Sequence, residues 1–314
     1  MKVLVTGATG FVGRALVERL ARESRVSVRA VVRGAVRRES VDLPAHVERV
    51  AGELDSAWDW RPALADVTIV VHLAARVHVM RDRASDPLTE YRRVNVAGTE
   101  HLARSAVASG VRRFVFLSSV KVNGEAGTFQ ETDTPHPVDP YGVSKLEAEG
   151  AVRTVAAGTS MDAAIIRAPL VYGPNVGANF GSLIRAVQSG VPLPFGAIHN
   201  RRSLVALDNL VDFIVVCMEH HAAVNETFLV SDGEDVSTAD LVRRLAHAAG
   251  RSARLIPVPP SLLALAASLA GRHDVAQRLM GTLCVDITKA HRQLAWVPPV
   301  SLDEGLRRAC SGRS

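Results

Sequence analysis

Lys2-Val3-Leu4-Val5-Thr6 is followed at once by Gly7-Ala8-Thr9-Gly10-Phe11-Val12-Gly13, and the architecture of the chain can be worked out from this junction. The β-branched run predicts a short buried strand, and Ala15, Leu16 and Leu20 predict a helix directly after the glycines. A strand, a glycine turn and a helix in this order are typical of a dinucleotide-binding unit, because glycines let the backbone approach a pyrophosphate and the helix N-terminus supplies N–H donors. A plain tight turn is the alternative explanation.

Further strands of the buried type follow along the first half of the chain, at residues 26–33, 47–51, 67–72 and 113–117. Because each of them precedes a segment that can form a helix, they predict an α/β fold with a Rossmann-type, doubly wound parallel sheet. Ligands bind such sheets at the carboxyl ends of the strands. Two short segments fall at that edge, Gly52-Glu53-Leu54 and His72-Leu73-Ala74-Ala75.

The end of the second strand bears on the choice of dinucleotide. A chain that prefers NAD usually has an acidic residue there, whereas an arginine nearby can bind the 2′-phosphate of NADP. Here the strand ends at Arg33, with Arg37 and Arg38 following, and no acidic residue lies between the strand and Glu39. The pattern favours NADPH over NADH; the alternative is that these arginines only form a solvated loop.

Tyr141-Gly142-Val143-Ser144-Lys145 places a phenol four residues before an ammonium. On a helix the two side chains would lie on one face, and a nearby cation favours the phenolate, so Tyr141 is a candidate general acid or base. Only four of the 37 basic residues are lysines, which indicates that a compact ammonium is needed at Lys145. Ser119 ends the fifth strand and could donate to an oxygen that Tyr141 also contacts. The alternative is an exposed Tyr and Lys on a surface helix.

Composition narrows the class of protein. At 314 residues, 47% hydrophobic and 22% charged, the chain is globular, with one large domain or two moderate ones. The net charge of +5 is dispersed along the chain, so we expect no nucleic-acid partner. The three cysteines and the histidines lack ligand spacing, so we expect no disulfide, no metal and a reducing, cytoplasmic location. The longest apolar run, 261–271, is about half of a membrane span and predicts a buried helix.

These motifs together resemble the extended short-chain dehydrogenase/reductase family, the nucleotide-sugar epimerases and dehydratases, over nearly the whole chain. The segments that carry the resemblance are the glycine loop from Thr6 to Gly13, His72-Leu73-Ala74-Ala75, Val94-Asn95, Leu117-Ser118-Ser119, Tyr141-Gly142-Val143-Ser144-Lys145 and Arg167-Ala168-Pro169-Leu170-Val171-Tyr172-Gly173-Pro174.

The resemblance implies a dinucleotide site, a sugar-nucleotide site and two domains. For the dinucleotide it implies the pyrophosphate loop Gly7, Gly10, Phe11, Val12 and Gly13, then Arg33, then Glu53 and Leu54 near the adenine, Leu73, Ala74 and Ala75 along the cofactor, Asn95 as a backbone clamp, Tyr141 and Lys145 at the nicotinamide ribose, and Pro169 and Val171 under the nicotinamide. For a UDP-sugar it implies Val77, His78, Ser119, Lys121, Tyr141, Asn179, Arg201 and Arg202. The cofactor domain would span residues 1–173 and be rejoined by 203–230, with 174–202 and 231–314 forming the sugar-nucleotide domain; we also expect a homodimer.

Two departures from the family pattern narrow the expected reaction. Family dehydratases have an acid pair where this chain has Val120 and Lys121, so elimination is not expected. Asn123 stands where many epimerases have a tyrosine, and residues 118–125 are most similar to bacterial reductases that form UDP-N-acetylquinovosamine or UDP-N-acetylfucosamine for surface polysaccharide such as O-antigen. We therefore expect a UDP-4-keto-6-deoxy-N-acetylhexosamine 4-reductase in which Ser119, Tyr141 and Lys145 are catalytic. A UDP-hexose 4-epimerase is the first alternative, and a non-catalytic NAD(P)-sensing regulator is the second.

Overall fold

The computed structural model describes residues 1–34, 43–77, 86–269 and 279–312. In the first half of the chain its elements are β1 (Lys2–Thr6), α1 (Phe11–Ala21), β2 (Ser27–Val32), β3 (Glu48–Ala51), α2 (Arg61–Leu64), β4 (Ile69–His72), α3 (Pro87–Tyr91), η2 (Arg92–Ala97), α4 (Gly98–Ala108), β5 (Arg113–Ser119), η3 (Val120–Val122), β6 (Gly127–Phe129) and α5 (Pro140–Ala156). In the second half they are β7 (Asp162–Ala168), β8 (Leu170–Tyr172), α6 (Ala178–Ser189), β9 (Arg202–Ala206), α7 (Leu207–Glu219), η4 (His221–Ala223), β10 (Thr227–Leu229), β11 (Asp235–Val236), α8 (Thr238–Ala248), α9 (Pro260–Leu269), β12 (Leu283–Val285), α11 (Thr288–Leu294) and α12 (Leu302–Ser311).

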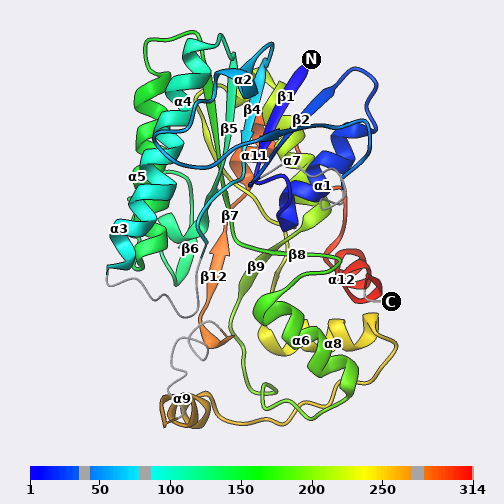
Figure 1. The fold of residues 1–314 in the computed structure, drawn as a ribbon. Coiled ribbons are helices and arrows are strands. Elements are labelled where there is room, and N and C mark those ends of the chain that lie inside the picture. The colour runs from blue at the N-terminus through cyan, green and yellow to red at the C-terminus, as the bar shows by residue number, and fades with distance from the viewer. Residues whose placement is uncertain (35–42, 78–85, 270–278, 313–314) are drawn as a thin grey trace.

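The larger of the two described sheets forms one half of the molecule. Its seven strands run in the order β10-β7-β5-β4-β1-β2-β3, and all the neighbouring pairs are parallel. The chain thus starts in the middle of the sheet, builds outward to β3 and then crosses to the other side of β1, which is the doubly wound topology. Figure 1 shows this sheet with helices packed against both faces. The predicted fold class is confirmed.

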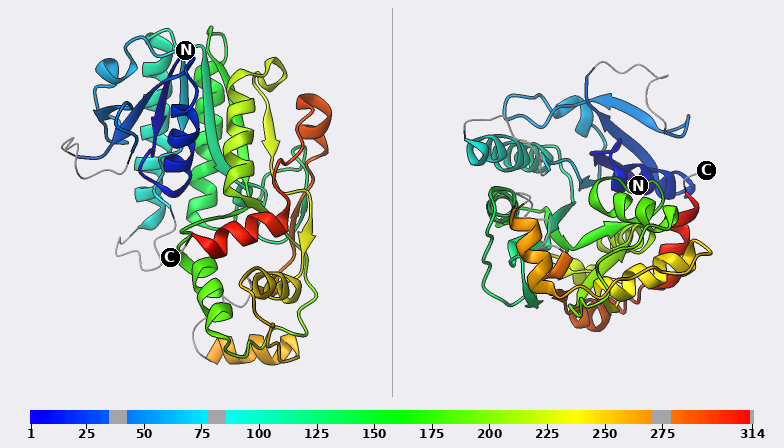
Figure 2. Two further views of the ribbon diagram at one scale, coloured as in Figure 1. Left: turned by 90° about the vertical axis from the view of Figure 1, so that its right-hand side faces the viewer. Right: turned by 90° about the horizontal axis from the view of Figure 1, so that it is seen from below.

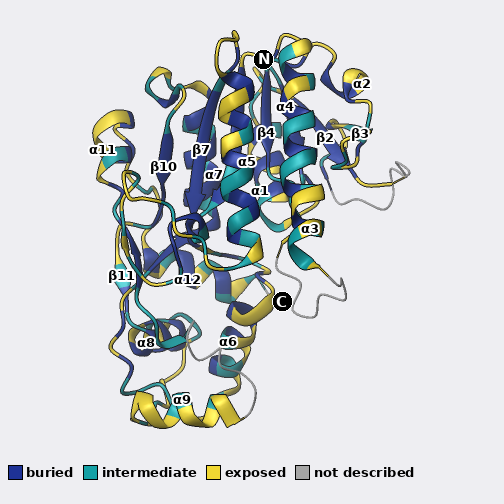
Figure 3. Cartoon of the chain, turned by 90° about the vertical axis from the view of Figure 1, so that its left-hand side faces the viewer, coloured by how far each residue is buried: buried dark blue, intermediate teal, exposed yellow. Residues whose placement is uncertain are grey.

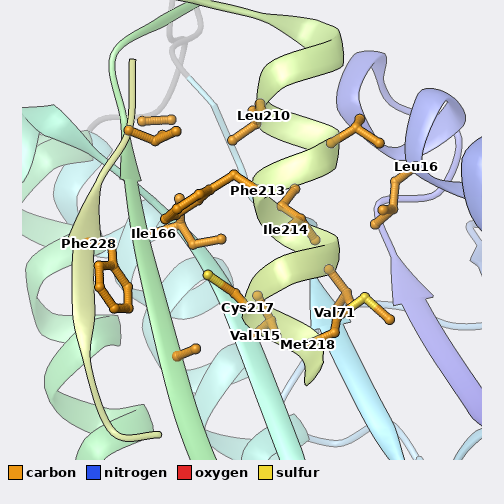
Figure 4. Packing of buried hydrophobic residues seen from close by; sticks show 14 of the residues in the cluster. Leu16, Val71, Val115, Ile166, Leu210, Phe213, Ile214, Cys217, Met218 and Phe228 are labelled. Atoms are coloured by element: carbon orange, nitrogen blue, oxygen red, sulfur yellow. The ribbon is translucent and has the colours of Figure 1, made fainter. Parts of the chain in front are cut away.

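Alternating residues of the strands supply two hydrophobic cores, one on each face of the sheet. Val3 and Val5 point into a core that is closed by α1, α7 and α11, whereas Leu4 between them points to the face covered by α2, α4 and α5. Strands buried on both faces read as continuous apolar runs, which is why they are visible in the sequence. Figure 4 shows α7 lying across the first face, with Phe213 and Ile214 directed at the strands.

A second, smaller sheet forms the other half. Its path is β11-β9-β12-β6, and β8 pairs with β9. Helices α6, α8 and α12 pack here around a separate core that includes Phe180, Leu241 and Leu306. The two halves and the position of the C-terminal helix can be followed in Figure 2.

The observed elements do not follow the predicted domain boundary throughout the chain. The return to the large sheet consists of α7 and β10, whereas β9, at residues 202–206, lies in the small sheet. Helix α11 belongs to the large-sheet side, since Ala290 and Leu294 are buried in the same core as α1 and α7. Strands β6 and β8, within the predicted cofactor domain, also pair in the small sheet, so hydrogen bonding and packing do not follow the order of the elements along the chain.

The helical region around Asn95 begins at α3, where the Asp86 side chain accepts from the backbone nitrogens of Leu88 and Thr89 and Pro87 occupies the first turn. The chain then passes through the π-helical segment η2 before α4. One helix differs from its prediction. Helix α9, expected to be buried, has no buried residue, and Figure 3 shows it exposed at the end of the small-sheet half.

Candidate active site

The glycine loop between β1 and α1 has the backbone geometry that a pyrophosphate requires. Gly7 has φ +67°, and a Cβ on it would lie 2.8 Å from the backbone nitrogen of Ala74. A Cβ on Gly13 would lie 2.0 Å from the carbonyl oxygen of Gly7. The N-cap of α1 is Gly10, which offers no capping side chain, and its first turn holds no acidic residue. The loop therefore presents helix N–H groups to an anion, and the residues fit a dinucleotide phosphate.

The loop after β4 is fastened to the glycine loop through Thr6. The Thr6 hydroxyl lies 2.6 Å from Nδ1 of His72 and accepts a hydrogen bond from the backbone nitrogen of Ala74 at 3.2 Å. The other ring nitrogen of His72 lies 2.9 Å from Thr99 Oγ1. Burial, aided by the nearby Lys145 charge, lowers the pKa of His72 to about 3, so the ring is neutral and serves as a structural link. This places Ala74 against the turn at Gly7.

Helix α5 brings Tyr141 and Lys145 to the site. Asp139 is its N-cap and accepts a hydrogen bond from the backbone nitrogen of Gly142 at 2.7 Å, and Pro140 occupies the first position. A Cβ on Gly142 would lie 2.8 Å from the carbonyl oxygen of Lys121. The glycine between Tyr141 and Lys145 therefore lets the start of the helix pack directly on the segment that follows β5.

Lys145 is the buried cation of the site. Its side chain is almost fully enclosed, its Nζ donates to the carbonyl oxygen of Leu117 at 2.7 Å, and it stands 4.0 Å from the centre of the Phe116 ring. Burial lowers the pKa of Lys145 to about 7, and the negative charge of Glu149 opposes this shift. A residue that titrates close to neutral pH in a cleft is typical of an active site.

Tyr141 lies beside Ser119, as predicted from their places in the sequence. Burial raises the pKa of Tyr141 above that of a free phenol, and Asp139 and Tyr91 raise it further, whereas a side-chain hydrogen bond with Ser119 lowers it. The ring meets Tyr91 edge-on, with 6.1 Å between ring centres. Burial, rather than the cation at Lys145, dominates the pKa of Tyr141, so the phenol form is favoured; it can donate a proton as it stands and must first ionise to accept one.

Asn95 is a clamp on the protein backbone, buried within the π-helical segment η2. Its amide accepts from the backbone nitrogen of Arg76 at 2.8 Å and donates to the Arg76 carbonyl and to Ser144 Oγ, each at 3.0 Å. It therefore ties the loop after β4 to helix α5. π-Helical turns often occur at functional sites.

A buried ion pair joins helix α5 to strand β7 next to the site. Glu149 and Arg167 are both under 5% exposed, and Arg167 donates to the two carboxylate oxygens at 2.9 and 2.7 Å. Ser118 donates to the same carboxylate at 2.5 Å, and Arg167 also donates to Asn123 Oδ1 at 3.1 Å. Asn123, noted in the sequence as a departure, is thus a buried partner of this ion pair.

A cavity of about 580 Å³ opens between the two halves of the molecule, next to Ser119 and Tyr141. Its size is that of a small-molecule site. The lining side chains are Val77, Ser119, Val120, Lys121, Glu125, Tyr141, Pro169, Leu170, Asn179, Phe180, Ser182, Leu183, Ala186, Leu193, Phe195, Arg202, Leu204, Thr238, Leu241, Leu279 and Leu283.

Most of the residues predicted to contact a UDP-sugar meet in this cavity. They are Val77, Ser119, Lys121, Tyr141, Asn179 and Arg202. Arg201 is not in the lining of the described cavity: its side chain is 69% exposed and pairs with Asp235 at 2.8 Å. Since alternate residues of a strand point to opposite faces, two neighbouring arginines could not both face the cavity. His78 lies outside the described residues.

The remaining predicted cofactor contacts follow the carboxyl ends of the strands. Arg33 is exposed just after β2, and Glu53 is exposed just after β3. Leu54 packs against Gly98 at the start of α4. Pro169 is buried beside the cavity, and Val171 is half-buried on β8. Arg37 and Arg38 lie outside the described residues.

Sequence reasoning missed a charged cluster at the sugar side of the cavity. Lys121 Nζ donates to Glu125 Oε1 at 2.9 Å and pairs closely with the carboxylate of Asp139. Asp139 and Pro140 are a recognisable helix start, so the cap at Asp139 could have been found. Its ion pair with Lys121 depends on how α5 packs on β5 and leaves no local pattern.

The part of the chain that the structure describes shows no group of three or more His, Cys, Asp or Glu side chains that could hold a metal. None of its helices is both long and apolar enough to cross a membrane.

A glycine loop with an open helix N-terminus, joined to a Ser, Tyr and Lys set at the same sheet edge, defines an NAD(P)-dependent enzyme of the short-chain dehydrogenase/reductase type. The sequence model of the family described as "NAD dependent epimerase/dehydratase family" matches residues 3–231. The chain belongs to this family, as its motifs predicted.

Similar proteins agree with this assignment. A UDP-glucose 4-epimerase of Vibrio cholerae is 48% identical over 312 residues, which is 98% of this chain and 93% of that protein. The solved structure of MoeE5 in complex with UDP-glucose and NAD has a TM-score of 0.77 at 28% identity, covering 99% and 97% of the two chains. A UDP-glucuronic acid 4-epimerase of Bacillus cereus in complex with NAD has a TM-score of 0.80 at 25% identity, covering 99% and 98%.

Proposed function

We propose that the protein is an NAD-dependent UDP-hexose 4-epimerase. The observation that carries the proposal is the cavity in which Ser119 and Tyr141 meet, with Arg202 of β9 in its lining. A guanidinium suits a diphosphate, and the hydroxyl pair suits the C4 oxygen of a hexose. The 48% identity to a protein named UDP-glucose 4-epimerase supports this reading.

The 4-reductase, which the sequence placed first, is now the second candidate. It rested mainly on residues 118–125, and in particular on Asn123 in place of an aromatic residue. Asn123 is 2% exposed, holds Arg167 and donates to the Gln130 carbonyl at 3.2 Å. Its position is therefore explained by the buried ion pair, without reference to a substrate. The curated and solved relatives described above support the epimerase better than the reductase.

Each side chain of the site has a separate role in the proposed reaction. The nicotinamide, when bound, supplies the acceptor and then the donor for the hydride at hexose C4. In the oxidation the phenolate form of Tyr141 would take the proton of the C4 hydroxyl, and in the reduction the resulting phenol would return it to the C4 oxygen of the 4-keto sugar, so the protein ends each cycle unchanged. Ser119 holds that oxygen. The Lys145 charge favours the phenolate form of Tyr141 against the effect of burial.

The cofactor form is also part of the proposal. We propose NAD, the cofactor named with MoeE5 and with the Bacillus cereus epimerase. NADP is the alternative, and Arg33 at the end of β2 favours it. A hexose of the UDP series is the proposed substrate; the homodimer, the cytoplasmic location, the role in surface polysaccharide and the two-domain division stay predictions.

The test is interconversion without added reductant. Purified protein should convert UDP-galactose into UDP-glucose with catalytic NAD, because an epimerase consumes none over its cycle. A requirement for stoichiometric NAD(P)H with a UDP-4-keto-6-deoxyhexosamine would instead establish the reductase. Binding of dinucleotide with neither activity would establish a sensing role, which the intact Ser119, Tyr141 and Lys145 set argues against.

A further inference from the structure

The charged side chains beside Ser119 and Tyr141 carry more negative than positive charge. Lys121 and Glu125 both line the cavity, and the Nζ of Lys121 lies within ion-pair distance of the carboxylates of Glu125 and of Asp139, which is not in the lining. All three side chains are only 20–27% exposed, so water screens them incompletely. Two carboxylates around one ammonium leave a net negative charge at this place.

The cluster lies at the hexose end of the cavity. Lys121 follows Ser119 by two residues, and its backbone nitrogen donates to Ser119 Oγ at 3.3 Å. Asp139 precedes Tyr141 by two residues, and its charge already raises the pKa of the Tyr141 phenol. A sugar whose C4 oxygen rests on Ser119 and Tyr141 therefore has this cluster as its neighbour.

Two other cations lie near the cavity, and neither is placed beside this cluster. Arg202 comes from β9 in the small sheet and donates to the Gly281 carbonyl at 3.2 Å. Lys145 is buried against Leu117 and Phe116 and is not part of the lining. A carboxylate on the hexose would thus meet Glu125 and a Lys121 that is already paired twice.

We infer that the Lys121, Glu125 and Asp139 cluster selects neutral UDP-hexoses and rejects UDP-hexuronates, a specificity that rests on the proposed function. Like charges brought together in a poorly screened site lower affinity, and rejecting a wrong ligand by repulsion is a common route to specificity. The cluster also offers Glu125 as an acceptor for a hydroxyl of a neutral sugar. The relative from Bacillus cereus is named for the opposite choice, UDP-glucuronic acid.

The experiment is isothermal titration of the NAD-loaded enzyme with UDP-glucose, UDP-glucuronic acid and UDP. We expect the wild-type protein to bind UDP-glucuronic acid at least about tenfold more weakly than UDP-glucose, a difference of about 1.4 kcal/mol. Glu125→Gln keeps an acceptor for Lys121 but removes one negative charge, so it should narrow this ratio about tenfold. Lys121→Gln removes the only cation of the cluster and should widen it.

The ratio of the affinities for UDP-glucose and UDP-glucuronic acid distinguishes a change in specificity from a general loss of binding. A distorted site or a lost cofactor would weaken the binding of both ligands together. Glu100→Gln is the matched control: Glu100 pairs with Arg104 on the exposed side of α4, and its loss should leave the ratio unchanged. Equal affinity of the wild type for both sugars, or an unchanged ratio in Glu125→Gln, would overturn the inference while the epimerase proposal stood. Failure of every UDP ligand to bind would overturn both.

Discussion

The buried carboxylate of Glu149 gives the sharpest test of how the catalytic helix is supported. Glu149→Gln would leave the Arg167 guanidinium, 4% exposed, without its counterion from the middle of α5. Breaking a buried pair on one side costs about 3–5 kcal/mol, because the remaining charge stays buried. At about 2–4 °C per kcal/mol for a domain of this size, the melting temperature should fall by roughly 6–20 °C.

Glu147→Gln is a control on the same helix, two residues away. Glu147 makes three hydrogen bonds with Arg92, at 2.6, 2.9 and 3.1 Å, but the two side chains are 33% and 51% exposed. Surface pairs contribute at most about 1 kcal/mol, so this variant should melt within about 4 °C of the wild type. Thermal and urea unfolding of both variants would measure the difference.

A double variant distinguishes an unpaired charge from a simple loss of contacts. Glu149→Leu combined with Arg167→Met removes both charges, and such replacements are often neutral or stabilising. We expect it to recover most of the stability that Glu149→Gln loses. If Glu149→Gln melts no lower than Glu147→Gln, the buried pair does not stabilise the fold as the burial of its two partners implies.

Three further predictions concern the reacting groups and the cofactor. Tyr141→Phe should lower turnover by about a hundredfold or more while leaving dinucleotide affinity nearly intact, and an initial-rate assay showing near wild-type turnover would exclude Tyr141 as the proton carrier. Burial depresses the pKa of Lys145 from 10.5 to about 7. Between pH 7 and 10 the lysine is therefore protonated in the unfolded chain and neutral in the folded one, so the free energy of unfolding should rise with pH over this range. The urea midpoint should rise less over the same range in Lys145→Met. If NADP is accepted, Arg33→Ala should weaken NADPH more than NADH in a fluorescence titration, and equal losses would mean that Arg33 does not contact the 2′-phosphate.

The fold could be predicted because its strands are continuous apolar runs and its first turn needs glycine. At Gly7 and Gly13 a Cβ would collide with backbone atoms, so a glycine at these positions directly indicates a tight turn. The small sheet could not be predicted in the same way. β6, β11 and β12 are two or three residues long, and β12 pairs with a strand more than 150 residues earlier. Such short strands carry no periodicity, and only their packing defines them.

The same contrast separates the catalytic groups from the groups that tune them. Tyr141 and Lys145 are four residues apart on one helix, so their spacing in the sequence predicts that they lie on the same face. Lys121 meets Asp139 across 18 residues only because Gly142 lets α5 rest on the Lys121 carbonyl. Asp139 is both the helix cap and a charge beside Tyr141. A single carboxylate thus fixes the position of the phenol and opposes its ionisation, so a substitution at Asp139 would change both the pKa of Tyr141 and the place where it sits. Glu125, which caps no helix, is therefore the position at which the charge of this cluster can be changed by itself.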